Sequence, residues 1–256
     1  MSIPSNIVSI LEPQIPVSQG IYEESSTQKG RLGTRLRVGD RTFYYARLST
    51  SANCSGGDVL CAPQVVASHQ SGIVTCAAAT TGATTVTITA GTAFTVNQYA
   101  EGYISVATGV GKGQMYRIKS HPVIATAATG VVTLYDSTPA TVAAGAVSFT
   151  PCLFNLVQVG SAALDIPVGV TPMAVTSGNY FWLQTWGPAA PRHVGASVAA
   201  GALALGTLGG LANFITTGTL GATGSMPVDY LTIIGKNWNL AATADQSNPV
   251  FLTILP

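Results

Sequence analysis

The strongest structural signal in this chain is the segment Thr34-Arg35-Leu36-Arg37-Val38-Gly39-Asp40-Arg41-Thr42-Phe43-Tyr44-Tyr45-Ala46-Arg47. Its first five residues alternate polar and apolar side chains, as a strand with one buried face does. Gly39-Asp40 fits a two-residue turn with glycine at the position that needs a positive φ. The last seven residues are rich in aromatic and other β-forming side chains. The segment therefore predicts a β-hairpin.

Similar strand signals continue to the end of the chain, separated at short intervals by Gly, Pro, Asn and Ser. No stretch shows the sustained 3.6-residue apolar period of a long helix. Gly109, Gly111 and Gly113 are expected to form the loop of a further hairpin. We predict strands at residues 84–89, 102–106, 114–119, 131–135, 146–149, 179–185, 230–234 and 250–255. This pattern predicts an all-β fold, built as a β-barrel or a β-sandwich.

Residues 1–33 differ from the rest of the chain and are predicted to form an extended N-terminal arm. Pro4, Pro13 and Pro16 favour extended backbone there and prevent a long helix. Such an arm either becomes ordered on a partner or remains a flexible terminus. Residues 34–256 are predicted to form the β-rich body. Within that body, a division into two β subdomains near residues 155–165 is considered.

The chain is poor in charge, with 8% charged residues compared with about 25% in ordinary soluble domains. Of its 21 charged side chains, ten lie in the first 47 residues. One explanation is that much of the surface is covered by other subunits, since exposed apolar area tends to mark contacts. The other is that Thr, Ser, Asn and Gln supply the polarity instead. The first explanation leads us to expect an oligomer, and a trimer in particular.

Several partners and locations are not expected from this composition. The formal net charge of +1 provides no electrostatic attraction to nucleic acid or to a membrane surface. Residues 194–228 carry no charge, but Gly, Thr, Ser, Asn and Pro interrupt them, so no apolar run is long enough to span a bilayer. The N-terminus lacks the basic segment and apolar run of a secretory signal. Synthesis and folding in the cytoplasm are therefore expected.

The sequence contains no catalytic signature, and we expect neither enzymatic activity nor a cofactor or metal. His69, His121 and His193 are isolated in sequence, and each is expected at the surface or in a turn. No two neighbouring acids form a catalytic pair, and no G-x-S-x-G motif marks a nucleophilic serine. The four cysteines are expected to be free and buried. Cys54 and Cys61 could form a disulfide only in an oxidising compartment.

Two groups of residues are candidates for contacts with partners. The basic set lies around the first hairpin, and within each strand its members can share one face. It can pair with an acidic protein lattice, or alternatively with nucleic acid. The second group is an aromatic cluster expected in the core or at a subunit interface. If the cluster were exposed, it could stack on sugars. The basic set is Arg31, Arg35, Arg37, Arg41 and Arg47, and the aromatic cluster is Tyr180, Trp182 and Trp186.

Three stretches together resemble a known family. They are Gly39-Asp40-Arg41-Thr42-Phe43-Tyr44-Tyr45-Ala46, the segment from Gly102-Tyr103-Ile104 to Gly113-Gln114-Met115-Tyr116-Arg117-Ile118-Lys119-Ser120-His121-Pro122, and Gly178-Asn179-Tyr180-Phe181-Trp182-Leu183-Gln184-Thr185-Trp186-Gly187. Their order is similar to that in structural proteins of tailed bacteriophages that decorate, or cement, capsids. The similarity covers roughly residues 30–190.

This resemblance implies a β-rich homotrimer on the outer surface of a virion. Such a protein would stabilise the capsid by bridging subunits of the major capsid protein, often through an extended terminal arm. Two other functions remain open. A head-fibre or tail component would share the composition, and a carbohydrate-binding β module would need the region of Trp182 and Trp186 to be exposed.

Overall fold

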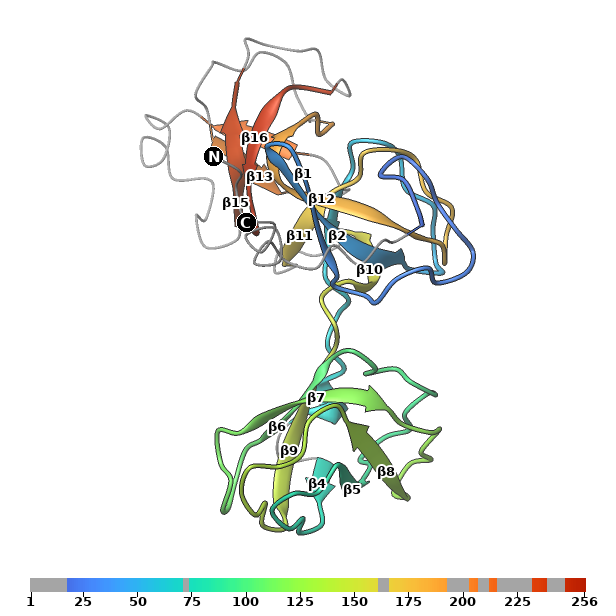
Figure 1. Cartoon of the computed structure of the whole chain (residues 1–256), viewed down its shortest axis with the longest axis vertical. Helices are drawn as coiled ribbons and strands as arrows, with labels where there is room; N and C mark the ends of the chain where they lie inside the picture. Colours follow the sequence, from blue (N-terminus) through green and yellow to red (C-terminus); the bar gives the residue numbers. More distant parts are fainter. Residues whose placement is uncertain are drawn as a thin grey trace, which may run out of the picture.

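The computed structural model describes residues 18–70, 74–160, 166–192, 203–206, 212–215, 232–238 and 247–256. It is an all-β protein, as the sequence predicts, and it consists of two β bodies joined by two connecting segments (Figure 1). We call these bodies the base and the inserted barrel. The single helical element in the described residues is a 3-10 turn, η2 (Ala67–His69).

The base is a ten-stranded sheet in the order β1-β2-β10-β3-β11-β12-β16-β15-β13-β14. A further pairing of β2 with β12 closes strands β2, β10, β3, β11 and β12 into a ring. The strands are β1 (Arg35–Val38), β2 (Arg41–Leu48), β3 (Val59–Cys61), β10 (Asn155–Val159), β11 (Pro167–Val170), β12 (Tyr180–Ala189), β13 (Leu203–Gly206), β14 (Ala212–Ile215), β15 (Thr232–Asn237) and β16 (Val250–Thr253).

The inserted barrel is a closed six-stranded barrel in the order β4-β5-β8-β7-β6-β9. All of its neighbouring strands are antiparallel. The predicted glycine loop connects β6 to β7, and Gly109, Gly111 and Gly113 all have positive φ. The strands are β4 (Val74–Cys76), β5 (Thr85–Thr89), β6 (Tyr103–Val106), β7 (Met115–Ser120), β8 (Thr129–Leu134) and β9 (Gly145–Thr150).

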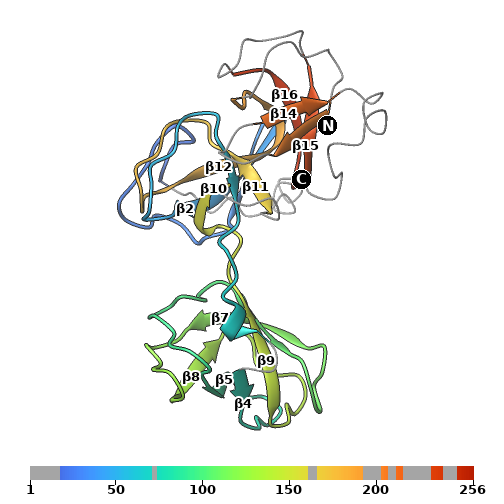
Figure 2. The same cartoon turned by 180° about the vertical axis from the view of Figure 1, so that it is seen from behind.

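The chain leaves the base after β3 and returns to it at β10, so the barrel is an insertion rather than a second half (Figure 2). The division considered near residues 155–165 lies just after the return from the barrel. The sequence predicts no boundary at the point where the chain leaves the base, between β3 and β4. This boundary was missed because β3 and β4 are only three residues long each, too short to show a period.

Each body has its own apolar core among the described residues. Inside the barrel, Phe94, Tyr99 and Phe149 are packed with aliphatic side chains from all six strands. In the base, Phe43, Tyr45 and Trp182 are the largest members of the main cluster. A smaller cluster of Val, Ile and Leu joins β3 and β11 to β15 and β16. Because no described apolar cluster spans both bodies, their relative position must depend on the connections and on polar contacts.

The first hairpin forms as predicted, with Val38 paired to Arg41 and Gly39 at φ 62°. A second glycine shapes the long strand β12. Residues 180–186 of this strand pair with β2, whereas residues 186–189 pair with β16. Gly187 lies at this change of partner with φ 85°, and a Cβ there would be 2.2 Å from the carbonyl oxygen of Asp40. Only glycine fits so close to a neighbouring backbone.

Residues 18–33, predicted as part of an extended arm, lie against the base. Ser25 and Tyr180 exchange two backbone hydrogen bonds of 3.0 and 2.8 Å. The buried Gln19 accepts hydrogen bonds from Tyr45 Oη (2.8 Å) and, through its carbonyl oxygen, from Trp182 Nε1 (2.9 Å). This half of the predicted arm is therefore integrated into the base. The other half, residues 1–17, lies outside the described residues.

Candidate interaction sites

The predicted arginines do not form one surface. Arg35 and Arg37 on β1 are directly opposite Tyr44 and Thr42 of β2, whereas Arg41 is opposite Val38. Because side chains alternate along a strand, Arg35 and Arg37 share one face and Arg41 and Arg47 share the other. The prediction that the basic residues of each strand share a face is confirmed for this hairpin. The two pairs are nevertheless separated by the sheet.

Arg41 and Arg47 make contacts within the chain and are only partly exposed. Arg41 Nη1 donates a 3.2 Å hydrogen bond to Tyr22 Oη, and Arg47 Nε donates a 3.2 Å bond to the carbonyl oxygen of Gly178. The Arg47 guanidinium also lies 5.3 Å from the centre of the Tyr180 ring. These two arginines therefore help to hold the N-terminal segment and the start of β12.

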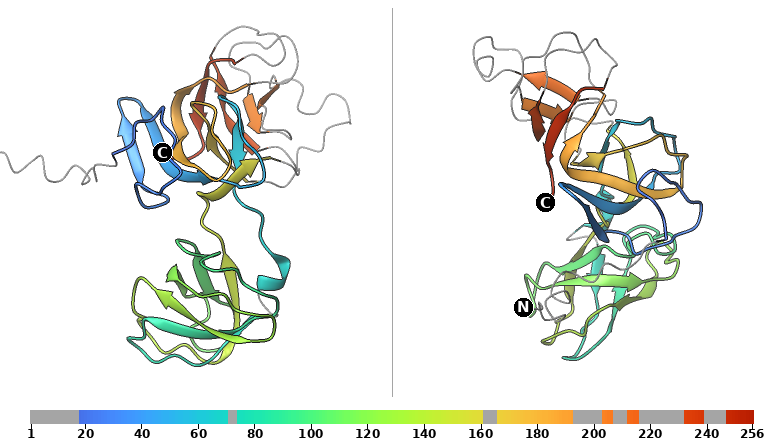
Figure 3. Two further views of the ribbon diagram at one scale, coloured as in Figure 1. Left: turned by 90° about the vertical axis from the view of Figure 1, so that its right-hand side faces the viewer. Right: turned by 45° about the horizontal axis from the view of Figure 1, so that its top comes forward.

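Strand β1 is an edge of the ten-stranded sheet and exposes both of its arginines. Arg35 lies beside the C-terminus, with Nη1 donating a 3.4 Å hydrogen bond to the carbonyl oxygen of Pro256. Figure 3 shows the C-terminus next to this blue hairpin. An edge strand carries unpaired backbone N–H and C=O groups that can bind a further strand. The β1 edge is therefore the part of the predicted basic set that is placed to meet another molecule.

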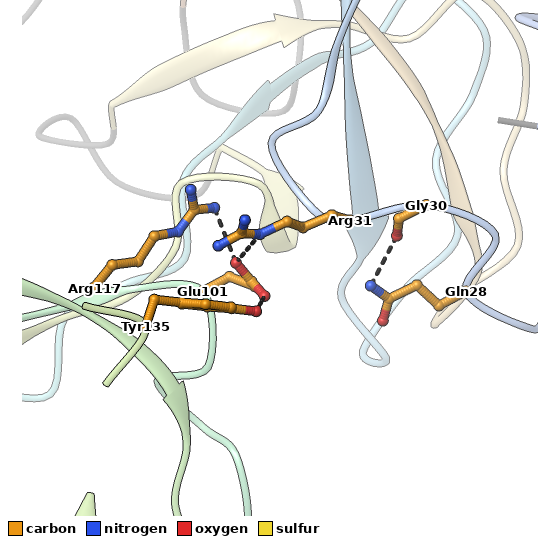
Figure 4. A network of polar contacts seen from close by, with 6 residues as sticks. All are labelled: Gln28, Gly30, Arg31, Glu101, Arg117 and Tyr135. Atoms are coloured by element: carbon orange, nitrogen blue, oxygen red, sulfur yellow. Dashed lines mark hydrogen bonds and ion pairs between the residues drawn. The ribbon is translucent and has the colours of Figure 1, made fainter. Parts of the chain in front are cut away.

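Arg31 connects the two bodies of the protein (Figure 4). Its Nε atom lies 2.8 Å from Oε2 of Glu101, which belongs to the inserted barrel. The same oxygen is 2.9 Å from Nη2 of Arg117 on β7, and Tyr135 donates a short hydrogen bond to Oε1. The Arg31 guanidinium lies over the Tyr135 ring at 4.0 Å. We call Arg31, Glu101, Arg117 and Tyr135 the junction cluster.

Glu101 shifts the pKa values of two of its neighbours in the junction cluster. Burial raises the pKa of Tyr135, and the hydrogen bond and charge of Glu101 raise it further. Burial alone lowers the pKa of Arg31, but the hydrogen bond and charge of Glu101 outweigh this effect and the pKa is raised. Glu101 itself has φ 65°, an unfavourable conformation for a non-glycine residue. The surrounding contacts thus keep one carboxylate in a strained position between two cations.

Each histidine was expected at the surface or in a turn. His69 lies in the turn η2 and His121 directly after β7, but neither is at the surface, since they are only 1% and 3% exposed. His69, on η2, contacts Tyr99 Oη through Nδ1 at 2.7 Å and Thr92 Oγ1 through Nε2 at 2.9 Å. Its ring stacks on Phe94 with centroids 3.8 Å apart. The outward connection is therefore fixed to the barrel by a buried histidine. His193 lies outside the described residues.

His121 is held as a neutral ring. Its Nε2 accepts a 3.0 Å hydrogen bond from the backbone N–H of Tyr99, so Nδ1 carries the proton that it shares with the carbonyl oxygen of Pro122 at 2.9 Å. A second proton, on Nε2, would point at the backbone N–H of Tyr99, so the protonated ring is disfavoured. Burial lowers the pKa of His121, and it also lowers that of His69, to which His121 adds a like charge when protonated. The sequence did not predict that either ring is buried, because the contacts that bury the rings come from residues 20–30 positions away.

The aromatic cluster belongs mainly to the core. Trp182 is 1% exposed and contacts Tyr45 edge-on with ring centroids 5.1 Å apart. Tyr180 and Trp186 are half-buried. Trp186 lies edge-on to Phe251 at 5.7 Å, and Tyr180 packs against the main cluster of the base. The region thus lacks the exposed aromatic strip that would make it a sugar-binding surface.

A groove of about 410 Å³ lies on the base, where seven separate segments of the chain meet. We call it the Trp238 groove. Trp238 and Tyr22, at 61% and 60% exposed, are the aromatic residues in its lining. Arg41 is the charged one, and the buried amide of Gln184 also contributes. None of the sequence signals located this groove, because its residues lie in short segments far apart in the chain.

The described residues also bear on metal binding, on disulfides and on membrane spans. No group of three His, Cys, Asp or Glu side chains in the described part of the chain is placed to hold a metal ion. All four cysteines are buried, and none of them is in a disulfide. Burial raises the pKa of the Cys54 thiol to about 12. No helix in the described ranges has the length and hydrophobicity needed to cross a membrane.

Comparison of the chain with family models, with curated proteins and with solved structures found no match.

Proposed function

We propose that this chain is a structural protein of a tailed-bacteriophage virion that decorates the outer capsid surface. In this proposal it acts as a homotrimer, stabilises the capsid by bridging subunits of the major capsid protein, and has no enzymatic turnover. The resemblance of residues 30–190 to decoration proteins supports the proposal. The low charge and the all-β fold are compatible with it.

The observation that carries the proposal is the division into two bodies. The base contains both the N-terminal segment from residue 18 and the C-terminal strand β16, whereas the barrel stands away from it on two connections (Figure 1). Since the barrel has its own core, it can project without losing its fold. Such an arrangement would let one body attach to the lattice while the other extends from it.

We assign the attachment surface to the β1 edge. It is open to an additional strand, and Arg35 and Arg37 can pair with acidic groups of the lattice. One exposed ion pair contributes only about 0–1 kcal/mol. Repetition over three subunits would increase the overall affinity well beyond that of a single contact. Arg31, Arg41 and Arg47 lie away from this edge and contribute indirectly, because they hold the N-terminal segment, the barrel and β12 in place.

The test is the binding of purified protein to particles of the phage that encodes it, prepared without this protein. Sedimentation should show saturable binding that weakens with salt, and cryo-electron microscopy should show trimeric density on the capsid exterior. Replacing Arg35 and Arg37 with Ala should weaken binding and reduce its dependence on salt. The matched control is the replacement of the exposed Lys112 and Lys119 of the barrel with Ala, which removes the same charge from the other body.

Three results would contradict the proposal. Density for the protein on the tail or in fibres would favour the alternative of a head-fibre or tail component. A monomer in light scattering would exclude the trimer. Unchanged binding of the variant that lacks both Arg35 and Arg37 would show that these arginines do not form the attachment surface.

A further inference from the structure

The Trp238 groove has the properties of a ligand site. Its volume of about 410 Å³ lies in the range of about 300–1,000 Å³ that is usual for small-molecule sites. The lining comes from the N-terminal segment, β2, the turn at Gly56-Gly57, the end of β11, β12, Trp238 directly after β15, and the residues just before β16. Elements with their own structural roles therefore converge on this groove, which lies on the base and away from the junction cluster.

The two aromatic side chains in the lining are unusually exposed. Of the three tryptophans, Trp182 is buried and Trp186 is half-buried, but Trp238 is 61% exposed. Its ring packs edge-on to Phe251, with centroids 6.1 Å apart, so one residue of the base supports it. Tyr22, at 60%, is the most exposed tyrosine of the described residues. Exposed, supported rings in one groove offer flat apolar surfaces to a ligand.

The polar groups of the groove are few and held in position. Gln184 is 4% exposed, and its Nε2 donates to the carbonyl oxygens of Trp186 (3.2 Å) and Pro188 (2.6 Å). These bonds occupy the amide donor, so Oε1 is the atom that can accept a hydrogen bond from a ligand. Arg41 is anchored through Nη1 by Tyr22 Oη. No carboxylate among the described residues forms an ion pair with Arg41, and its other N–H groups can donate to an anion.

We propose that the Trp238 groove binds an acidic saccharide, one whose rings carry hydroxyl groups and a carboxylate. The C–H faces of the sugar rings would stack on Trp238 and Tyr22. A hydroxyl would donate to Gln184 Oε1, and the carboxylate would accept from Arg41, forming a charge-assisted hydrogen bond. This chemistry uses each distinctive group of the groove. The inference does not depend on a role in capsid decoration.

The test uses the full chain and four probes: digalacturonic acid, N-acetylneuraminic acid, lactose and a polyproline peptide. Binding is measured by saturation-transfer NMR and titration calorimetry. At least one of the two acidic sugars should bind, whereas lactose and the peptide should bind at least about tenfold more weakly. Replacing Trp238 with Ala should weaken the binding of the acidic sugar at least about tenfold, since it removes a stacking surface.

Three further variants separate the contributions of the groove residues. Arg41→Gln should reduce acid binding about tenfold and remove most of its dependence on salt, because it removes the charge but keeps a hydrogen-bond donor. Tyr22→Phe should keep the stacking surface and have a smaller effect. Tyr103→Ala, an exposed tyrosine on the barrel, is the control and should change binding by less than about twofold.

Each alternative outcome would overturn the inference. Equal binding of lactose would show that Arg41 does not select an acid. Preferential binding of the polyproline peptide would identify the groove as a peptide site instead. Absence of binding by both acidic sugars, or binding that survives in a folded Trp238→Ala variant, would rule out an acidic saccharide site here. Because none of these assays involves a capsid, their failure leaves the decoration proposal to its own test.

Discussion

Replacing Glu101 with Gln should loosen the connection between the base and the inserted barrel. The substitution keeps the size of the side chain and an oxygen that can accept the hydrogen bond of Tyr135. It removes the negative charge that both Arg31 and Arg117 contact at 2.8–2.9 Å. Two guanidinium groups then face each other across a neutral amide, so the cluster loses two ion pairs and gains a repulsion.

The size of the effect follows from the exposure of the three side chains. Glu101 is 12% exposed, whereas Arg31 and Arg117 are 43% and 30% exposed. A fully exposed pair contributes about 0–1 kcal/mol, and breaking a fully buried pair costs about 3–5 kcal/mol. Water can reach both arginines after the substitution, which limits the loss. We therefore expect Glu101→Gln to lower the free energy of unfolding by about 1–2 kcal/mol.

The assay is denaturant unfolding of the full chain, combined with small-angle X-ray scattering to follow the relative position of the two bodies. Asp136→Asn removes the same charge from an exposed site on the same barrel and is the matched control. A double-mutant cycle with Arg31→Gln isolates the contact between the bodies, which should be coupled by about 0.5–1 kcal/mol. High salt should weaken this coupling.

Equal stability of Glu101→Gln and Asp136→Asn, together with zero coupling in the cycle, would refute this reasoning. The two connections alone would then fix the relative position of the bodies, and the contacts of the junction cluster would be a result of that position.

Three further predictions concern other parts of the structure. Burial lowers the pKa of His69 and His121 in the folded state. The free energy of unfolding should therefore be independent of pH above the unfolded pKa of about 6.5 and should fall as the pH drops below it. In a pH series of unfolding curves, His121→Gln should reduce this loss of stability at low pH, and a wild-type stability that does not change with pH would contradict the buried neutral rings. The four buried cysteines should react with a thiol reagent only when the protein unfolds, so that rapid labelling of the native protein would disagree with the structure. Gly187→Ala should destabilise the protein by at least about 3 kcal/mol because a Cβ cannot fit beside Asp40. Gly39→Ala, with open space around the added Cβ, should cost only about 1–2 kcal/mol. Similar losses of stability for the two variants, measured by calorimetry, would argue against the close approach of Gly187 to the backbone of Asp40.

Much of the local structure of this protein could be predicted from short stretches of its sequence. Strand identity depends on alternation and on β-forming side chains, and both are properties of neighbouring residues. The segment at residues 84–89 became β5, residues 114–119 became most of β7, and Gly39-Asp40 formed the predicted turn. The all-β class followed because no segment offered a competing helical period. The short strands β3, β4, β10 and β11 escaped notice because three to five residues contain too little pattern.

Which of these strands pair with one another depends instead on contacts between residues far apart in the chain. The parallel pairing of β10 with β2 brings residues 155–157 beside residues 47–48, and this pairing makes the barrel an insertion. Long-range contacts also bury two histidines and pair Arg31 with a carboxylate seventy residues away. The Trp238 groove likewise forms between segments that are distant in the sequence. Such contacts depend on the total free energy of packing two bodies, in which hundreds of weak interactions oppose chain entropy. No local pattern records that balance, so the sites it creates become visible only in the folded chain.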